Sequence, residues 1–355
     1  RRILYAMQDM GIKHTSSHKK SARIVGECFV QGTLVSTPQG LKKIEDLQRG
    51  DEVYTQSGIQ SITELYTMPA QPLCRVELEN GLSNTATKGQ LFKVLQPDMT
   101  FAWRKAQDLL PGDVVVMRQA ASTNPESDQI SAGMAYLLGL FISDGWISGK
   151  KYPRIGWACS DKSTMQNVAR ILAEDFGYQA KISERELESG STLYTVRASK
   201  QEIVNEFIQH AIQDKKAHTK TIPDAVLQAS KKIQYEFISG LVDGDGSVHT
   251  SRNMIHYGSV SKTLIQQLQS LLFSLGISSQ LYINKQSPGN IQGRRIHAKH
   301  QSFSIEVSSC QEVQLSKQLH LQNPKKKSRA NRIAHADVKK SSANNIPYAA
   351  KNVFS

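Results

Sequence analysis

Two stretches of sequence decide the fold of this chain, LLGLFISDG at residues 137–145 and ISGLVDGDG at residues 238–246. Each is an apolar run with small residues four positions apart, and each ends in Asp-Gly, at Asp144 and Asp245. Small residues at positions i and i+4 form a flat stripe on a helix, which lets two helix backbones approach closely. We therefore expect two helices packed side by side, with the two aspartates next to each other at the helix ends.

The sequence that follows these two stretches also repeats in the same order. After each Asp-Gly comes a strand-like stretch, then an amphipathic helix at 164–177 and 263–276, then another strand. A matching order over roughly 50 residues per copy indicates an internal duplication. The sequence therefore predicts two pseudo-symmetric α/β repeats in this part of the chain.

The two aspartates also predict a metal site. Two carboxylates held close together repel each other unless a cation lies between them. Mg²⁺ suits such a pair because it takes few carboxylates, keeps several waters and otherwise binds substrate phosphates. Asp144 and Asp245 are therefore the predicted metal ligands. Beneath a basic β surface they would suit phosphodiester hydrolysis. Purely structural Asp-Gly helix ends are the alternative.

Composition favours a polyanionic partner for one part of the chain. The 355 residues have a net charge of +13, yet residues 28–120 hold nine basic and ten acidic residues. A basic surplus elsewhere predicts binding to a polyanion such as DNA, with a chance excess of surface lysine as the alternative. The chain shows no bilayer-spanning apolar run and no signal peptide. Its four widely spaced cysteines exclude a CxxC zinc site. We expect a cytoplasmic protein without a membrane anchor.

The pattern from Cys28 to about Met117 is different. Short β-branched runs are separated by turn residues about every 8–12 positions, which is typical of an all-β domain. We expect this domain over residues 28–120, with a polar loop as its boundary. The two α/β repeats are then expected over 130–228 and 229–355.

The two nonapeptides resemble the paired LAGLIDADG motifs of homing endonucleases. The resemblance implies an α+β endonuclease with two αββαββα repeats, monomeric and bound to double-stranded DNA. It places the metal-binding acidic residues of the family at Asp144 and Asp245. The lysine of the family, usually just before Ile-Pro, matches Lys220 in KTIP. A lysine there would orient the attacking water or offset charge in the transition state.

The resemblance is incomplete at two places. The second copy has NNIP at 344–347, with Asn344 where a lysine would stand, which leaves Lys340 or Lys299 as candidates. Ser143 occupies a position where many members of the family have a second acidic residue.

The β-rich segment resembles inteins, which are self-splicing protein insertions. CFVQGTLVSTPQGLKKIEDLQRGD, from Cys28, resembles their first block, and NTATKGQLFKV at 84–94 resembles their second. With PGDVVVM, these blocks imply the N-terminal part of an all-β Hint splicing fold over 28–118. Endonucleases of the LAGLIDADG type commonly lie inside inteins, in the order seen here.

The intein resemblance assigns three residues a role, and it needs no cofactor. Cys28 would attack the carbonyl carbon of Glu27 and convert the peptide bond to a thioester. Thr87 would help bind the scissile amide. Gln90 stands where the family has histidine, and a glutamine amide donates a hydrogen bond but cannot shuttle a proton. The first step is therefore expected to be slower, or assisted from elsewhere.

The first 27 residues are expected to belong to a host protein. RRILYAMQDMGIKHTSSHKKSARIVGE resembles the breakage-reunion region of the A subunits of type IIA DNA topoisomerases, either DNA gyrase or topoisomerase IV, and predicts a helix over 1–10. In that family GKYHPHGD follows this segment. The closing splicing blocks are missing before Ser355, which predicts a truncated chain or one completed in trans.

The predicted function joins these parts. The chain is interpreted as a fragment of a topoisomerase A-chain precursor in which protein splicing is coupled to site-specific double-strand DNA cleavage with Mg²⁺. Its partners would be the intein-free host gene and the host segments, near the nucleoid. A catalytically dead remnant that only binds DNA is one alternative, and a plain type II DNA topoisomerase is another. The basic run PKKKSRANR is either a solvated linker or a contact to the DNA backbone.

Overall fold

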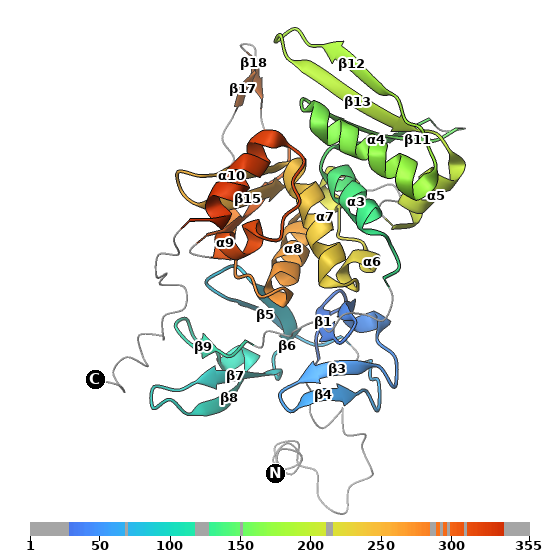
Figure 1. Ribbon diagram of the computed structural model, residues 1–355. Coiled ribbons are helices and arrows are strands. Elements are labelled where there is room, and N and C mark those ends of the chain that lie inside the picture. The colour runs from blue at the N-terminus through green and yellow to red at the C-terminus, as the bar shows by residue number, and fades with distance from the viewer. Residues whose placement is uncertain are drawn as a thin grey trace, which may run out of the picture. The chain divides into compact units, whose positions relative to one another are not determined.

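Figure 1 shows the computed structural model of the chain. The structure describes residues 28–67, 70–117, 128–149, 152–210, 216–284, 289–291, 294–296, 299–308 and 311–336. These residues form two compact units, 28–37 with 42–117 and 38–41 with 128–336. The segment 1–27, with its predicted helix, lies outside the described residues.

The first unit consists of short strands joined by tight turns, as the turn-rich sequence predicts. Its sheets are the hairpins β1–β2, β3–β4 and β5–β6 and the three-stranded sheet β8-β7-β9. Acidic residues close the turns, since Asp51 accepts from the backbone N–H of Gln48 at 2.8 Å and Asp113 from that of Leu110 at 2.7 Å. The elements are β1 (Leu34–Thr37), β2 (Gly40–Lys43), η1 (Ile44–Asp46), β3 (Glu52–Thr55), β4 (Gly58–Ser61), β5 (Leu73–Glu77), β6 (Ser83–Thr87), β7 (Leu91–Leu95), β8 (Phe101–Lys105), η2 (Ala106–Asp108) and β9 (Val114–Val115).

The second unit contains the element order αββαββα twice, which confirms the two predicted pseudo-symmetric repeats. Both sheets are antiparallel and have equivalent strand orders, β10-β11-β13-β12 and β14-β15-β19-β16. The first repeat consists of α3 (Ala132–Asp144), β10 (Gly145–Ser148), β11 (Arg154–Cys159), α4 (Lys162–Phe176), β12 (Ile182–Glu186), β13 (Thr192–Ala198) and α5 (Gln201–His210). The second consists of α7 (Lys231–Asp243), β14 (Gly246–His249), β15 (Met254–Ser259), α8 (Lys262–Ser274), β16 (Gln280–Ile283), β19 (Phe303–Val307) and α9 (Gln311–Ser316).

Five further elements lie between the repeats, within the second repeat between β16 and β19, or after it. They are η3 (Ala217–Thr219), α6 (Asp224–Leu227), the hairpin β17 (Gly289–Ile291) and β18 (Arg294–Ile296), and α10 (Pro324–Ala334). The basic run PKKKSRANR forms most of α10, so its interpretation as a linker is wrong. Asn323 caps this helix by accepting from the backbone N–H groups of Lys325 and Lys326, and Pro324 occupies the first turn. In the described part of the chain, no helix has the length and apolarity that crossing a bilayer requires.

The helices α3 and α7 lie side by side in the second unit and touch backbone to backbone (Figure 1). A Cβ atom added at Gly139 would lie 2.1 Å from the carbonyl oxygen of Phe237. One added at Gly240 would lie 2.1 Å from the carbonyl oxygen of Tyr136. The predicted stripe of small residues is therefore confirmed as the contact between the two repeats.

Aromatic packing holds the first sheet against its helices. The ring of Trp157 on β11 lies 5.9 Å from that of Phe141 on α3 and 5.2 Å from that of Phe207 on α5, between ring centroids. All three side chains are fully buried. This face of the sheet therefore belongs to the core, and alternate strand residues point to the opposite face.

We expect a methyl group at either helix contact to destabilise the fold. Gly139→Ala and Gly240→Ala should each lower the free energy of unfolding by about 1–3 kcal/mol, because neither backbone can yield without separating the helices. Gly258→Ala is the matched control, since a Cβ there would meet its nearest atom at an ordinary 3.5 Å. Chemical denaturation measures all three variants. Equal stability of the Gly139 and Gly258 variants would contradict the close approach.

Candidate functional site

The structure brings Asp144 and Asp245 together at the ends of the paired helices. Asp144 is the last residue of α3, and Asp245 follows the end of α7 by two residues. Both residues are exposed, although the helices that carry them are buried. Partial desolvation raises the pKa of Asp144, and the negative charge of Asp245 raises it further. The two carboxylates are therefore close enough to repel each other.

This donor set fits a magnesium ion. Carboxylate oxygens are hard ligands, and Mg²⁺ completes its coordination with waters and substrate phosphates rather than with a full set of protein groups. Zinc sites instead use three or four nitrogen and sulfur ligands. Among the residues that the structure describes, no group of three or more His, Cys, Asp or Glu side chains is arranged to hold a metal ion. The pair thus suits a hard cation shared with a substrate.

Lys220 lies beside the first of these aspartates. Its ammonium group donates to the carbonyl oxygen of Ile142 and, at 3.2 Å, to that of Ser143, in the last turn of α3. Burial lowers the pKa of Lys220, while the charges of Asp245 and Asp144 oppose this effect. The predicted lysine is therefore located at the carboxylate pair and is held by the end of a helix.

The second copy has an equivalent lysine, Lys326, which the sequence pattern did not indicate. Its ammonium group donates to the carbonyl oxygens of Val242, Asp243 and Gly244, at 2.9, 2.8 and 2.8 Å. Burial lowers the pKa of Lys326, and the charges of Asp243, Asp144 and Asp245 oppose this effect. Each aspartate thus has a lysine on the carbonyl groups that precede it.

Lys326, and not the candidate Lys299, takes this position among the described residues. Lys299 is exposed, and Lys340 and Asn344 lie outside the described residues. A spacing signal was present, since Lys326 follows Asp245 by 81 residues and Lys220 follows Asp144 by 76. The second Ile-Pro pair, in NNIP, does not mark this lysine, because Lys326 lies in the first turn of α10.

In the first copy, the second acidic position of the motif falls on a different residue from the one expected. Asp243 precedes Asp245 by two positions and is buried, with 4% of its surface exposed. The residue two positions before Asp144 is Ile142, which is 1% exposed. Ser143 instead faces Gly244, where an added Cβ would lie 2.3 Å from its own Cβ. The prediction for Ser143 is therefore wrong, and Ile142 replaces the acid.

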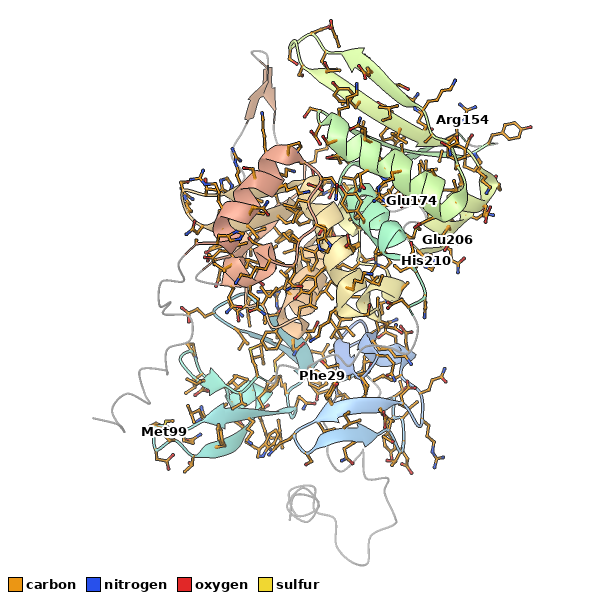
Figure 2. All side chains as sticks on the ribbon, viewed as in Figure 1. Phe29, Met99, Arg154, Glu174, Glu206 and His210 are labelled. Carbon is orange, nitrogen blue, oxygen red and sulfur yellow. The ribbon has the colours of Figure 1, made fainter. Side chains whose placement is uncertain are left out.

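The free faces of the two sheets differ in charge. In the first sheet Gly156 pairs with Arg197 and Arg185 with Leu193, so Arg185 and Arg197 point away from the core, together with Arg154. Figure 2 labels Arg154 on β11. In the second sheet the face opposite the core carries, among others, His256, which pairs with Glu306. The expected basic β surface is thus found in the first repeat.

In the first unit, Cys28 lies against strand β6. Thr87 accepts from the backbone N–H of Cys28 through its hydroxyl at 3.1 Å, and its own N–H donates to the Cys28 carbonyl oxygen at 2.9 Å. The next residue, Phe29, forms a bridge with Ala86 and is labelled in Figure 2. The structure therefore brings Thr87 to the backbone N–H of Cys28, which belongs to the predicted scissile amide.

The surroundings of Cys28 affect how readily its thiol ionises. Burial raises the pKa of its thiol, so less thiolate is present at neutral pH than for a free cysteine.

Gln90 donates from its side-chain amide to the carbonyl oxygen of Leu91 at 3.3 Å. Its backbone N–H donates to the Thr87 carbonyl oxygen at 3.0 Å, which places Gln90 one turn from the Cys28 contact.

Comparisons with known families agree with this architecture. Residues 132–211 and 232–303 match the LAGLIDADG-like domain family, and residues 27–70 match the Hint domain family. The two LAGLIDADG matches coincide with the two structural repeats. These findings support an intein-like Hint region followed by a LAGLIDADG homing-endonuclease fold.

Several proteins with different names contain segments that are similar in sequence to this chain. ATP-dependent DNA helicase Hel308 of Methanocaldococcus jannaschii is 24% identical over 72% of this chain. The DNA gyrase A chain of Mycobacterium kansasii is 24% identical over 52%, and protein RecA of Mycobacterium tuberculosis is 29% identical over 60%. The matches cover 21%, 34% and 28% of those relatives, so the chain spans about a fifth to a third of their length.

Solved structures of homing endonucleases are similar to part of the chain. I-DmoI in complex with DNA and Ca is 18% identical, with a TM-score of 0.40, over 58% of this chain and 98% of that one. I-WcaI bound to its DNA recognition sequence is 12% identical, with a TM-score of 0.40, over 57% and 88%.

The carboxylate pair should lower stability when no cation is present. The pKa of Asp144 is raised in the folded state, so ionised Asp144 destabilises the fold. This destabilisation is absent below the ordinary carboxyl pKa, grows as the pH rises towards the raised pKa and is complete above it. At pH 7 in chelator, Asp144→Asn should therefore melt higher than the wild type, by a few degrees at most. Excess Mg²⁺ should stabilise the wild type more than this variant.

Thermal unfolding between pH 3 and pH 7 provides the measurement. Glu188→Gln, an exposed change on the β12–β13 loop, is the control for the loss of one negative charge. A melting temperature in chelator at pH 7 that is lower for Asp144→Asn than for the wild type would contradict the proposed repulsion.

Proposed function

We propose that this chain is part of an intein-containing precursor that combines protein splicing with site-specific, magnesium-dependent cleavage of double-stranded DNA. One observation supports the proposed nuclease activity. Two exposed carboxylates, Asp144 and Asp245, meet at the ends of abutting helices, and each has its own half-buried lysine. Paired carboxylates with flanking ammonium groups suit phosphodiester hydrolysis on two DNA strands.

The residues of the site have distinct roles in this proposal. Asp144 and Asp245 would hold Mg²⁺, which supplies a more acidic attacking water and offsets charge on the phosphate. Lys220 binds the carbonyl group before Asp144 and Lys326 the one before Asp245, and each would serve one scissile phosphate. Because burial lowers the pKa of each lysine, its ammonium is poorly solvated and interacts strongly with an approaching phosphate or hydroxide.

The DNA would lie on the free faces of the two sheets. Arg154, Arg185 and Arg197 share such a face in the first repeat. Arginine binds phosphates and the guanine edge in the major groove. Because His256 and Glu306 are on the corresponding face of the second repeat, the two DNA half-sites should differ in sequence. A single chain supplies both repeats, so the enzyme is proposed to act as a monomer.

The variety of relatives supports an inserted element. A helicase, RecA and a gyrase chain share similar segments with this chain, and a mobile insertion found in several hosts accounts for that. We infer a host segment from a topoisomerase A chain at residues 1–27, a splicing domain over 28–120 and endonuclease repeats over 130–228 and 229–355. The DNA target would be the intein-free host gene, which places the protein at the nucleoid.

Splicing would begin at the Glu27–Cys28 bond. The Cys28 sulfur attacks the Glu27 carbonyl carbon, the C–N bond breaks, and the released Cys28 nitrogen takes up the thiol proton, leaving a thioester. Thr87 holds the nitrogen that must leave, through the hydroxyl contact at 3.1 Å. The raised pKa of Cys28 keeps most of the thiol protonated until the step occurs.

The nuclease proposal is tested with the full chain and a duplex library. A defined member joins the codons of residues 1–27 directly to codons for GKYHPHGD, the others carry random sequence, and cutting is followed with and without Mg²⁺. Asp144→Asn and Asp245→Asn should each slow cleavage of both strands by at least about a hundredfold. DNA binding by gel shift should persist, because contacts to the DNA backbone do not use these carboxylates.

Glu188→Gln serves again as the control and should cut like the wild type, since Glu188 is an exposed residue of the β12–β13 loop and is not one of the proposed site residues. Binding without cleavage by the wild type in Mg²⁺ would favour the alternative of a catalytically dead, DNA-binding remnant. Wild-type rates in both aspartate variants would overturn the metal assignment.

Splicing chemistry is tested by thiol-induced cleavage of the full chain. With dithiothreitol, residues 1–27 should be released over time, and Cys28→Ala should abolish this release because the attacking sulfur is gone. Thr87→Ala should slow it by about tenfold, through loss of the hydroxyl at the scissile nitrogen. Cys74→Ala is the matched cysteine control. Release from Cys28→Ala at the wild-type rate, read by mass spectrometry, would rule out this mechanism.

A further inference from the structure

The buried carboxylate of Asp243 is not one of the proposed metal ligands, yet it makes three hydrogen bonds. It accepts from the backbone N–H of Gln322 at 2.6 Å and from that of Asn323 at 3.2 Å. It also accepts from the hydroxyl of Tyr136, on α3 of the other repeat, at 2.7 Å. Those backbone groups immediately precede α10, the helix that carries Lys326. Asp243 therefore fixes the start of that helix to the end of α7.

Lys220 is fixed by different bonds. The hydroxyl of Ser261 donates to the Lys220 carbonyl oxygen at 2.6 Å. The side-chain oxygen of Gln267 accepts from the backbone N–H of Ile222 at 2.8 Å. Ser261 caps α8 and is fully buried, and Gln267 is 7% exposed. Thus α8, in the second repeat, holds the segment that serves the first motif.

These two sets of bonds share no residue. In the first motif the position of Asp243 is taken by buried Ile142, whose side chain can accept no hydrogen bond. Within the described part of the chain, the two sets meet only where they end, at the abutting ends of α3 and α7 that carry the carboxylate pair. Because separate bonds position the two lysines, we expect a defect in one set to displace one ammonium group more than the other.

We propose that Asp243, held by Tyr136, is a positioning residue that controls cleavage of one DNA strand through Lys326, while Ser261 and Gln267 control cleavage of the other through Lys220. This inference rests on the proposed nuclease function. Under this proposal, the cleavage rate of one DNA strand can be changed without changing that of the other. A change of one side chain outside the carboxylate pair then converts the double-strand cleavage into strand-selective nicking.

The experiment uses the full chain and the duplex selected in the library test, with a different fluorophore on each strand. Lys326→Met first identifies the strand that depends on Lys326. Asp243→Asn should slow that strand by about tenfold or more and leave the other within about twofold, since the two backbone N–H groups bind different oxygens and one of these becomes an NH2 donor. Tyr136→Phe, which removes one donor, should give the same strand preference with a smaller effect.

Gln267→Met is the mirror variant, because it removes the acceptor for Ile222 and keeps the side-chain length. It should slow the opposite strand, the one slowed by Lys220→Met. A loss of overall stability slows both strands alike, so the ratio of the two rates separates positioning from unfolding, and thermal melts accompany each variant.

Each result has a distinct meaning. Accumulation of nicked duplex with opposite strand identity in Asp243→Asn and Gln267→Met supports the proposal. Equal slowing of both strands, or no slowing, in Asp243→Asn while the wild type cuts normally overturns it and leaves the nuclease function intact. Absence of cutting by the wild type on every library member overturns the proposed function, and this inference with it.

Discussion

The direct contact between the backbones of α3 and α7 is the constraint on which the candidate nuclease site depends. Gly139 and Gly240 each leave room for a carbonyl oxygen of the facing helix, where a Cβ would lie 2.1 Å away. Because the helices touch along this line, their ends coincide and Asp144 meets Asp245. Any side chain larger than hydrogen at the contact would separate the helices, and with them the carboxylates.

This geometry creates an electrostatic problem that the rest of the site balances. Two carboxylates face each other, and their repulsion adds to the desolvation that raises the pKa of Asp144. Two half-buried ammonium groups, at Lys220 and Lys326, oppose that repulsion. Neither lysine forms a direct ion pair with Asp144 or Asp245 among the described contacts, since each is bound to helix carbonyls. The carboxylate oxygens therefore remain available to a cation.

The parts that were predictable from sequence are those with a local signal. The duplication, the element order and the glycine contact follow from spacing within single helices and strands, and the structure confirms them. No local pattern marks Lys326, and only its distance from Asp245 along the chain, similar to that between Asp144 and Lys220, pointed to it; its place depends on how α10 packs against the end of α7. The counterpart of Asp243 was misassigned for a related reason. Ser143 and Ile142 are adjacent in sequence, and counting back from the motif aspartates puts Ile142 opposite Asp243, with both side chains buried.

The two halves of the duplicated unit show which feature has to be kept and which is free to vary. In one half the lysine comes from a short connector held by α8, and in the other it comes from the first turn of α10, held by Asp243. The bonds, the supporting residues and the local sequence all differ, yet both ammonium groups lie on the carbonyl groups before a motif aspartate. The chemistry constrains the position of the charge relative to the carboxylates. The route by which the backbone delivers it is set only by what the neighbouring helices can hold.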